Sequence, residues 1–199
     1  MARVKDIQID EVSKEIRPIY KKFIENYGPF SNQAKVFAHR PIIFKYMMSM
    51  LMEMADKPII DKRYLEIAIV SVSAINKCDY CVAHHAPNLI SEGLSNVTVD
   101  NILETDCPGL EPLDILVRDY AVQITKDHNK IQDKVFEKLR EYFSEEQMVE
   151  LTFRITLCTF FNKFNDVMQL EMEDSQLLYL KNCKSVSYTH LRAHETSLH

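Results

Sequence analysis

Apolar residues recur at every third or fourth position along most of the chain, the spacing of one face of an α-helix. Polar or proline-containing stretches separate these runs, and no stretch predicts a strand. We therefore expect an all-α fold, a single-domain helical bundle. The predicted helices cover residues 9–27, 31–36, 41–55, 62–76, 78–92, 112–126, 132–143 and 144–170, and a further short helix begins at Thr98.

Several residues mark where these helices begin and end. Pro41 can begin a helix because its missing N–H is not needed in a first turn. Asp61 can cap the next helix, and Ser144 with Gln147 forms a capping-box pattern. Pro87 implies either a kink or an early end to the helix over residues 78–92.

The run over residues 65–75 is apolar on nearly every side except at Glu66, Ser71 and Ser73. Periodicity alone does not separate a buried helix from a buried strand in such a run. Its length, and the lack of any second strand to pair with it, favour a helix. Asn76–Lys77 then indicates a break before the next helix, so the two helices form a hairpin.

Composition limits the class of protein. A chain of 199 residues is long enough for one domain with a proper core, and we assign residues 1–185 to it. Only three glycines favour helices over a sandwich or barrel. A net charge of −5 gives no reason to expect a nucleic-acid or anionic membrane partner. With no apolar signal region and no apolar run of roughly 18 residues, we expect a soluble, cytoplasmic protein.

Thiol chemistry is concentrated in residues 78–85, the run Cys-Asp-Tyr-Cys-Val-Ala-His-His. The five cysteines are an odd number, which argues against a secreted disulfide framework. In a reducing compartment, a close cysteine pair indicates redox catalysis or metal binding. On a helix, Cys78, Cys81 and His85 lie within roughly 60° of one another, whereas His84 points roughly 100° away. His85 is therefore placed to take a proton from Cys81.

The start of a helix also changes the acidity of a thiol. Cys78 and Cys81 lie at or inside the first turn, where free N–H groups and the helix dipole favour a thiolate. Cysteines so placed can have a pKa lowered by about one to several units. The thiolate is the form that attacks a peroxide oxygen or a disulfide.

Glu66 can join this chemistry only through the hairpin. On one continuous helix it would lie roughly 18 Å from Cys78. If the chain reverses at Asn76–Lys77, Glu66 lies beside His85, where a carboxylate orients the imidazole and raises its basicity. The arrangement predicts a relay from Cys81 through His85 to Glu66, directly or through a water. Cys78 would then resolve the oxidised Cys81 into a disulfide.

Other interpretations of the motif remain open. A structural zinc site could use Cys78, Cys81 and His84 or His85, but no second pair of ligands stands at finger-like spacing. A redox-sensing module would carry the same cysteine pair without turnover. A thioredoxin-like fold is excluded because no βαβ pattern surrounds the motif. Haem attachment is excluded because it needs a histidine directly after the second cysteine, where this chain has Val82.

The glutamate, eleven intervening positions and then Cys-x-x-Cys-x-x-x-His resemble the alkyl hydroperoxidase D branch of the carboxymuconolactone decarboxylase-like family. The resemblance covers residues 40–95 well, and the C-terminal half fits in its helical character. It implies an all-helical fold, homo-oligomers (trimers or hexamers) and reduction of hydroperoxides without a bound cofactor or metal. The electrons would come from a dithiol such as dihydrolipoamide, or from a lipoylated or other thiol reductant protein.

By position, the resemblance implies that Cys81 is the peroxidatic cysteine and Cys78 the resolving one, with His85 and Glu66 as the proton relay. Tyr80 departs from the pattern, because the best-known members carry a second histidine between the cysteines. The decarboxylase branch lacks the cysteine pair, so decarboxylation is not expected.

The remaining cysteines and histidines receive structural interpretations. We expect Cys107, Cys158 and Cys183 to be non-catalytic, with Cys158 in the core. We expect His84 to be an ordinary polar or partly buried residue and His128 to be solvated in a turn.

The last residues, 186–199, are set apart from the domain. Val186–Thr196 resembles the translation of a transposase adapter used in sequencing libraries, so we expect an artefact from about Ser185 onward, or else a natural disordered tail. His190 and His194 therefore carry no functional weight despite their ligand-like spacing.

Overall fold

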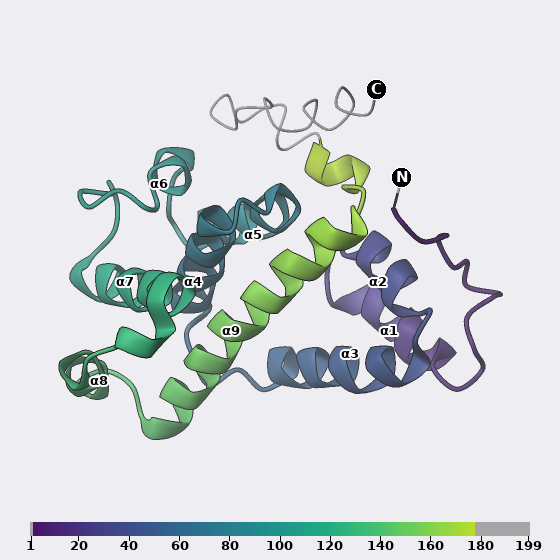
Figure 1. Ribbon diagram of the computed structural model, residues 1–199, viewed down its shortest axis with the longest axis horizontal. Helices are drawn as coiled ribbons and strands as arrows, with labels where there is room; N and C mark the ends of the chain where they lie inside the picture. The colour runs from purple at the N-terminus through teal and green to yellow at the C-terminus, as the bar shows by residue number, and fades with distance from the viewer. Residues whose placement is uncertain (1, 178–199) are drawn as a thin grey trace.

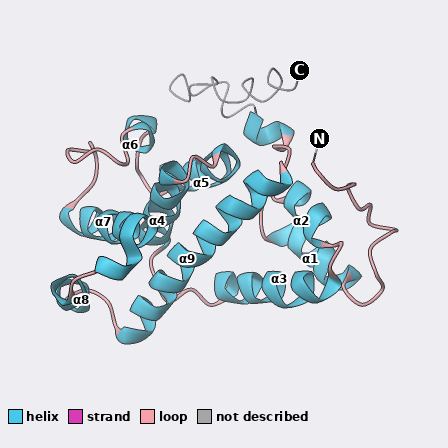
Figure 2. Cartoon of the chain, in the orientation of Figure 1, coloured by secondary structure: helices cyan, strands magenta, loops and turns pink. Residues whose placement is uncertain are grey.

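The computed structural model describes residues 2–177. Within that range it is built of helices without a strand, which confirms the all-α prediction (Figures 1 and 2). None of the described helices is both long and apolar enough to cross a membrane. The expectations for residues 186–199 and for Cys183 lie outside the described residues.

The helices are α1 (Arg17–Asn26), α2 (Ser31–Phe37), α3 (Pro41–Asp56), α4 (Lys62–Ile75), α5 (Asp79–Ser91), α6 (Asn96–Asp100), α7 (Pro112–Asp127), the 3₁₀ turn η1 (His128–Lys130), α8 (Asp133–Arg140) and α9 (Glu145–Met168).

The long helix α9 runs diagonally between two groups of helices (Figure 1). On one side, α4 packs against α5, α7 and α9 around a core rich in Ile, Val and Leu. On the other side, α1, α2 and α3 form a second apolar cluster, against which Leu157, Phe161 and Phe164 of α9 pack. The two clusters therefore meet along α9, and the space between them is where a cavity can form.

Most of the predicted helix starts are confirmed. Pro41 begins α3, and the Asp61 side chain accepts a hydrogen bond from the N–H of Arg63 at 2.8 Å. Ser144 and Gln147 form the predicted capping box at the start of α9. These contacts are local, so the sequence pattern was sufficient to predict them.

The first predicted helix is wrong at its start, because α1 begins at Arg17 and not near residue 9. Pro18 explains the difference. It has no N–H to donate to a preceding turn, so it belongs in the first turn of a helix and not in its middle. Val12 and Ile16 are nevertheless buried, in turns that precede the helix.

Two further predicted boundaries differ, the start of α6 and the end of α8, which stops at Arg140 and not at residue 143. The short helix α6 begins at Asn96, because Ser95 is its cap and Thr98 supplies the reciprocal bond of a capping box. Pro87 does not end α5, which continues to Ser91.

The turn between α4 and α5 has the geometry that ends many helices. Lys77 adopts a left-handed conformation with φ of 57°. The N–H of Lys77 donates to the carbonyl of Ala74, and the N–H of Cys78 donates to the carbonyl of Ser73. These two bonds form a Schellman motif, which usually has glycine at the left-handed position. The chain thus reverses within two residues, and Cys78 becomes the N-cap of α5.

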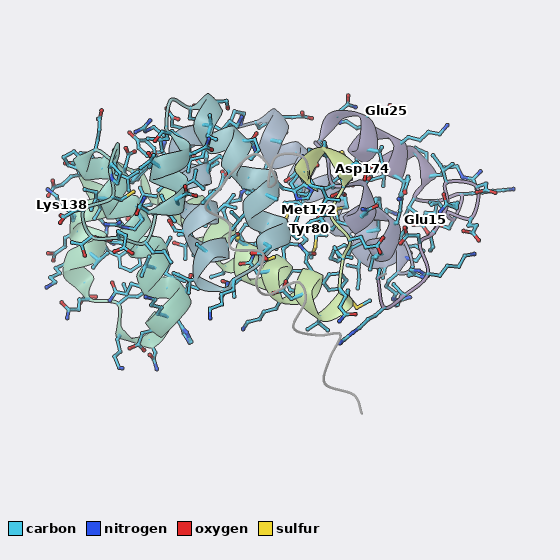
Figure 3. The ribbon with its side chains drawn as sticks, turned by 90° about the horizontal axis from the view of Figure 1, so that it is seen from above. Glu15, Glu25, Tyr80, Lys138, Met172 and Asp174 are labelled. Carbon is cyan, nitrogen blue, oxygen red and sulfur yellow. The ribbon has the colours of Figure 1, made fainter. Side chains whose placement is uncertain are left out.

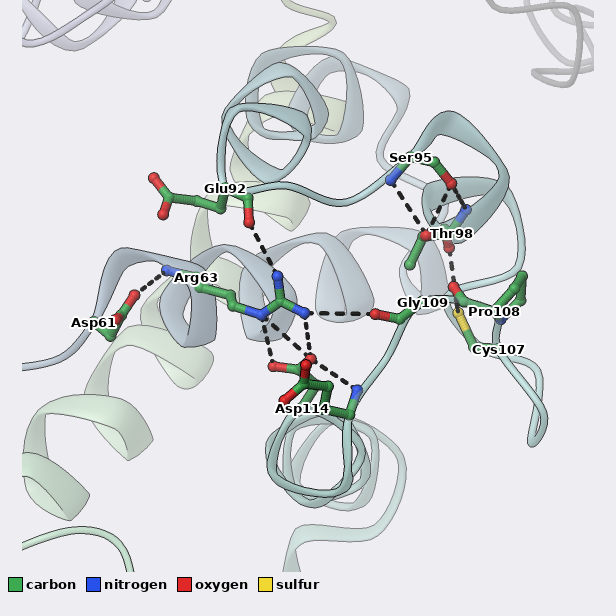
Figure 4. Close-up of polar contacts among 10 residues, drawn as sticks. Asp61, Arg63, Glu92, Ser95, Thr98, Cys107, Pro108, Gly109 and Asp114 are labelled. Atoms are coloured by element: carbon green, nitrogen blue, oxygen red, sulfur yellow. Dashed lines mark hydrogen bonds and ion pairs between the residues drawn. The ribbon is translucent and has the colours of Figure 1, made fainter.

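Arg63 fixes the start of α4 to the neighbouring segments (Figure 4). Its guanidinium donates to the Asp114 carboxylate at 2.6 Å and to the carbonyl of Glu92 at 3.0 Å. Asp114 lies on α7 and is almost fully buried, whereas Glu92 ends α5. One side chain therefore ties α4 to α7 and to the end of α5, which stabilises the hairpin from the side opposite its turn.

Candidate active site

The hairpin brings Glu66 of α4 to His85 of α5, as predicted. His85 Nδ1 lies 2.8 Å from Glu66 Oε2, and Asn88 Nδ2 donates to Glu66 Oε1 at 3.0 Å. Both carboxylate oxygens are thus engaged, on a side chain that is only 9% exposed. Because a carboxylate accepts, His85 Nδ1 is the donor in this contact, and Nε2 is the ring nitrogen that Glu66 does not engage.

Cys78 and Cys81 lie together at the N-terminal end of α5, both as free thiols. Cys78 is fully buried and Cys81 is 6% exposed. The Cys78 thiol donates to Cys81 Sγ at a sulfur–sulfur distance of 2.9 Å, and Asn165 Nδ2 donates to the same sulfur at 3.3 Å. Cys81 is therefore the acceptor of the pair and the better place for a negative charge.

The two thiols have pKa values shifted in opposite directions. The hydrogen bond from Cys78, aided by Asn162 and Asn165, lowers the pKa of Cys81 although burial opposes the shift. The hydrogen bond to Cys81, together with burial, raises the pKa of Cys78. The sequence predicted a lowered pKa for both thiols at the helix start. In the structure only Cys81 has a lowered pKa, and that of Cys78 is raised. The proton between the two sulfur atoms therefore stays on Cys78.

His84 is a structural residue, as its position off the cysteine face predicted. It is 3% exposed, and its ring stacks on Tyr80 and on Phe30. Its Nδ1 bonds to the Tyr80 carbonyl at 2.6 Å, and its Nε2 lies 2.7 Å from a carboxylate oxygen of Glu173. With both ring nitrogens engaged, His84 has no atom left for proton transfer with substrate.

Glu173 belongs to a segment that returns over the cysteine pair after α9 ends at Met168. Figure 3 shows Tyr80 beside the labelled Met172 and Asp174 of this segment. The Tyr80 hydroxyl donates to Glu173 at 3.1 Å, and Leu170 packs against Cys78, Tyr80 and Cys81. Burial acts to raise the pKa of Glu173, but the hydrogen bond and charge of His84 and the N–H of Asn32 outweigh it and leave the pKa lowered.

Sequence reasoning missed Glu173, Asn162 and Asn165 as residues of this site. Glu173 gave no signal, because it stands in a polar stretch beyond the last predicted helix. The two asparagines did give one, since amides three residues apart on an otherwise apolar helix face need a buried partner.

A cavity opens between the two halves of the molecule, and both Cys81 and His85 line it. About 60 Å³ of it is open to the centres of water-sized molecules, several times the roughly 10–15 Å³ that one water needs. Among the described residues, no hydrogen bond joins Cys81 to His85, so the first step of the predicted relay crosses this cavity. The other lining residues are Tyr27, Phe30, Gln33, Leu51, Ile69, Arg154, Leu157, Cys158, Phe161 and Asn165.

Cys158 and His128 lie where the sequence placed them, and Cys107 also lies within the described residues. Cys158 is buried in the core of α9, and burial raises the pKa of its thiol to about 12, so it stays protonated. Cys107 is buried against the Thr98 carbonyl, away from the cavity. His128 is exposed in the turn after α7.

The donor atoms of the motif do not converge as a metal site would require. Within residues 2–177, no group of three or more His, Cys, Asp or Glu side chains is arranged to hold a metal ion. His84 and His85, the histidines that a zinc site would use, instead hydrogen-bond to Glu173 and Glu66.

Known proteins resemble the chain in one segment of sequence and in overall fold. The carboxymuconolactone decarboxylase family matches residues 41–108, which span α3 to α6 and the loop that follows. Among curated proteins, none matches the chain.

Solved structures share the fold at low sequence identity. A peroxidase-related protein with an alkylhydroperoxidase AhpD core from Ralstonia eutropha JMP134 is 21% identical with a TM-score of 0.75, covering 89% of this chain and 95% of its own. A peroxidase-related protein from Silicibacter sp. TM1040 is 18% identical with a TM-score of 0.74, covering 86% and 92%. A variant of the debrominase Bmp8, in complex with 2,3,4-tribromopyrrole, is 16% identical with a TM-score of 0.72, covering 92% and 100%.

The segment that carries the family match contains the Cys78–Cys81 pair, His85 and Glu66, and the chain shares the AhpD-like fold over 86–89% of its length with the two peroxidase-related structures. Residues 41–108 are therefore a carboxymuconolactone decarboxylase family segment within an AhpD-like fold.

Proposed function

We propose that this protein is a thiol-dependent peroxidase that reduces hydroperoxides through Cys81 and Cys78, with His85 and Glu66 as its proton relay. The observation that carries the proposal is that the pKa values of the two thiols are shifted in opposite directions. Cys81 has the lowered pKa and lines the cavity, whereas Cys78 holds the proton 2.9 Å away. A nucleophile and its resolving partner need this asymmetry.

The first step oxidises Cys81. Its thiolate attacks the outer oxygen of the hydroperoxide, the O–O bond breaks and an alkoxide leaves. The alkoxide takes a proton to become an alcohol, and Cys81 becomes a sulfenic acid. His85 faces the same cavity with its Nδ1–H held by Glu66, so a proton carried on Nε2 can be delivered to the leaving oxygen directly or through a water.

The second step forms the disulfide and restores the site. Cys78 attacks the Cys81 sulfur and hydroxide leaves, taking up the Cys78 proton as water. A dithiol such as dihydrolipoamide, free or on a lipoylated or other thiol protein, then reduces the disulfide and is itself oxidised. In sum, one hydroperoxide and one dithiol give one alcohol, one water and one new disulfide.

Turnover is the test. Purified protein with cumene hydroperoxide and dihydrolipoamide should consume peroxide steadily, far beyond one equivalent per chain. A single stoichiometric oxidation would instead identify a redox sensor. Metal analysis tests the remaining alternative: one zinc per chain, whose removal unfolds the protein, would overturn the peroxidase proposal.

A second reaction class follows from the similarity to the debrominase structures. The same cysteine pair could reduce a carbon–bromine bond, with bromide released, hydrogen taking its place and the disulfide formed. The aromatic and aliphatic lining around Phe30 and Phe161 suits such a ring. Bromide release from 2,3,4-tribromopyrrole in the presence of a dithiol, at a rate above that of peroxide consumption, would favour this activity.

We also propose that the chain assembles into homo-oligomers through the outer face of α9. Val149, Phe153 and Phe160 are exposed there at helical spacing, and Val149 is 71% exposed. Exposed apolar stripes of this kind are typical of interaction surfaces. Light scattering should give a mass that is a multiple of 23.3 kDa, and Val149→Glu should lower it, whereas Val97→Glu on α6 should not.

A further inference from the structure

Arg154 brings an unsatisfied cationic donor to the cavity of the candidate active site. It lies on α9 among the residues that line the cavity. Its Nη1 atom is buried and has no hydrogen-bond partner. Buried guanidinium groups are normally paired, because a charge removed from water without a partner costs several kcal/mol.

The position of Arg154 on α9 gives the cavity two different ends. Arg154, Leu157, Cys158, Phe161 and Asn165 recur every three or four residues, so they form one stripe of the helix. Asn165 contacts Cys81, and eleven residues separate it from Arg154. At 1.5 Å per residue, the two backbone positions lie roughly 16 Å apart along the helix axis. The cation is therefore at one end of the stripe and the candidate nucleophile at the other.

Tyr27 lines the same cavity as Arg154 and is affected by the charges of both Arg154 and Glu66. Burial raises the pKa of the Tyr27 hydroxyl, the positive charge of Arg154 and its hydrogen bond oppose the shift, and the charge of Glu66 adds to it. Both charged groups therefore act on one phenol.

The surroundings of Arg154 leave its charge available to a ligand. None of the residues that line the cavity is a carboxylate. Glu66 is close, but both its oxygens are held by His85 and Asn88. The charge of Arg154 acts to lower the pKa of Glu150, one turn before it on α9, but no ion pair joins the two side chains in the described part of the chain. The other lining side chains near the stripe are mostly apolar.

We propose that Arg154 binds an anionic group of the substrate, and that the substrate is an apolar hydroperoxide carrying a carboxylate. Arginine is suited to this role because its planar fork matches a carboxylate bidentately. The apolar stripe of α9 would contact the body of the molecule, and the hydroperoxide would reach Cys81 at the far end. The hydroperoxide part of this assignment rests on the proposed peroxidase function, whereas carboxylate binding at Arg154 does not.

A matched pair of hydroperoxides tests the assignment. Cumene hydroperoxide is neutral, and its analogue with a para carboxylate differs by that one anionic group. The wild type should prefer the carboxylate in kcat/KM by about 10- to 100-fold, the range expected for one charge-assisted contact. Arg154→Gln should lose that preference, because its kcat/KM should fall far more on the carboxylate than on cumene hydroperoxide, and Arg154→Lys should retain part of it. Arg140→Gln, at an exposed position on α8, is the matched control and should behave as wild type.

Direct binding separates this inference from the peroxidase proposal. Benzoate, titrated calorimetrically into the wild type and into Arg154→Gln, reports carboxylate binding without turnover. Weakening by about 10-fold or more in the variant, with an unchanged circular dichroism spectrum, supports the site even if neither hydroperoxide is consumed. Equal benzoate affinity in the two proteins, or an equal loss of activity on both hydroperoxides, would overturn it. If Arg154→Gln fails to fold, the same comparison is made with Arg154→Lys, whose unchanged benzoate affinity and unchanged preference would also count against the fork-like contact.

Discussion

His85 Nδ1 and Glu66 Oε2 lie 2.8 Å apart, although nineteen residues separate them in the sequence. The contact exists because Lys77 reverses the chain within two residues and sets α4 and α5 side by side. Asn88 holds the second carboxylate oxygen, so the glutamate is fixed from two sides. A histidine with one nitrogen so held presents the other in a defined tautomer, as a general acid or base requires.

Glu66→Gln tests whether the charge of this carboxylate matters. The amide keeps the shape and one acceptor oxygen, but it removes the negative charge beside His85 Nδ1. We expect the second-order rate of Cys81 oxidation by hydroperoxide to fall by roughly 100-fold, at the lower end of what general acid–base catalysis contributes. Stopped-flow measurement of the first oxidation isolates this step from disulfide reduction.

Glu53→Gln, on α3 with a side chain 69% exposed, is the control for the same chemical change away from the site. Its rate should equal that of the wild type. An unchanged rate in Glu66→Gln, with its fold intact, would show that Glu66 only supports the hairpin.

Serine substitutions separate the roles of the two thiols. Cys81→Ser should abolish peroxide reduction, because it removes the thiol with the lowered pKa. Cys78→Ser should react once and then stop as a sulfenic acid, which dimedone traps for identification by mass spectrometry. Cys107→Ser, at a buried thiol outside the cavity, should turn over normally. A Cys78→Ser variant that still turned over with dihydrolipoamide would show that Cys78 is not required for resolution.

Asn165 is predicted to set the acidity of Cys81. Its amide donates to Cys81 Sγ, and this hydrogen bond is among the causes that lower the Cys81 pKa below its ordinary value of 9.0. Asn165→Leu should therefore raise the pKa of Cys81, and the midpoint of the alkylation rate against pH should move to higher pH. Iodoacetamide labelling, followed on the peptide that contains Cys81, measures this midpoint. A midpoint that stays in place would mean that the hydrogen bond from Cys78 suffices alone.

The sequence predicts the parts of this site that depend on local pattern. The break at Asn76–Lys77 and the spacing of Cys81 and His85 are consequences of helix geometry, so the Glu66–His85 contact follows from the amino-acid pattern of the hairpin alone. The predicted start of α1 is wrong because the apolar spacing continues through Pro18, which blocks a continuous helix.

The residues that sequence analysis missed act across long separations. Asn165 contacts Cys81 across 84 residues, and Glu173 contacts His84 across 89. Helical periodicity says which face of a helix is buried, but it does not say which other helix that face meets. The sequence could not predict that Arg154 Nη1 has no hydrogen-bond partner, because the atoms around it come from both halves of the chain.

Glu173 provides the last prediction, which concerns stability and its dependence on pH. Its carboxylate joins His84, Tyr80 and the N–H of Asn32, and its side chain is 11% exposed. Glu173→Gln keeps the shape but removes the charge, and we expect the free energy of unfolding at pH 7 to fall by about 1–3 kcal/mol. Glu141→Gln, whose partner Lys138 is half-exposed, should change it little.

The sign of the pH effect follows from the lowered pKa of Glu173. A carboxyl group that is more acidic in the folded state than its ordinary value of 4.5 stabilises the fold fully above that value. This stabilisation is lost as the pH falls through the lower, folded pKa. The difference in unfolding free energy between wild type and Glu173→Gln should therefore be constant from pH 7 to about pH 5 and shrink below pH 4.5. Urea unfolding at each pH measures it, and a difference that persisted unchanged at pH 3 would show that the charge of Glu173 is not what holds this segment over the cysteine pair.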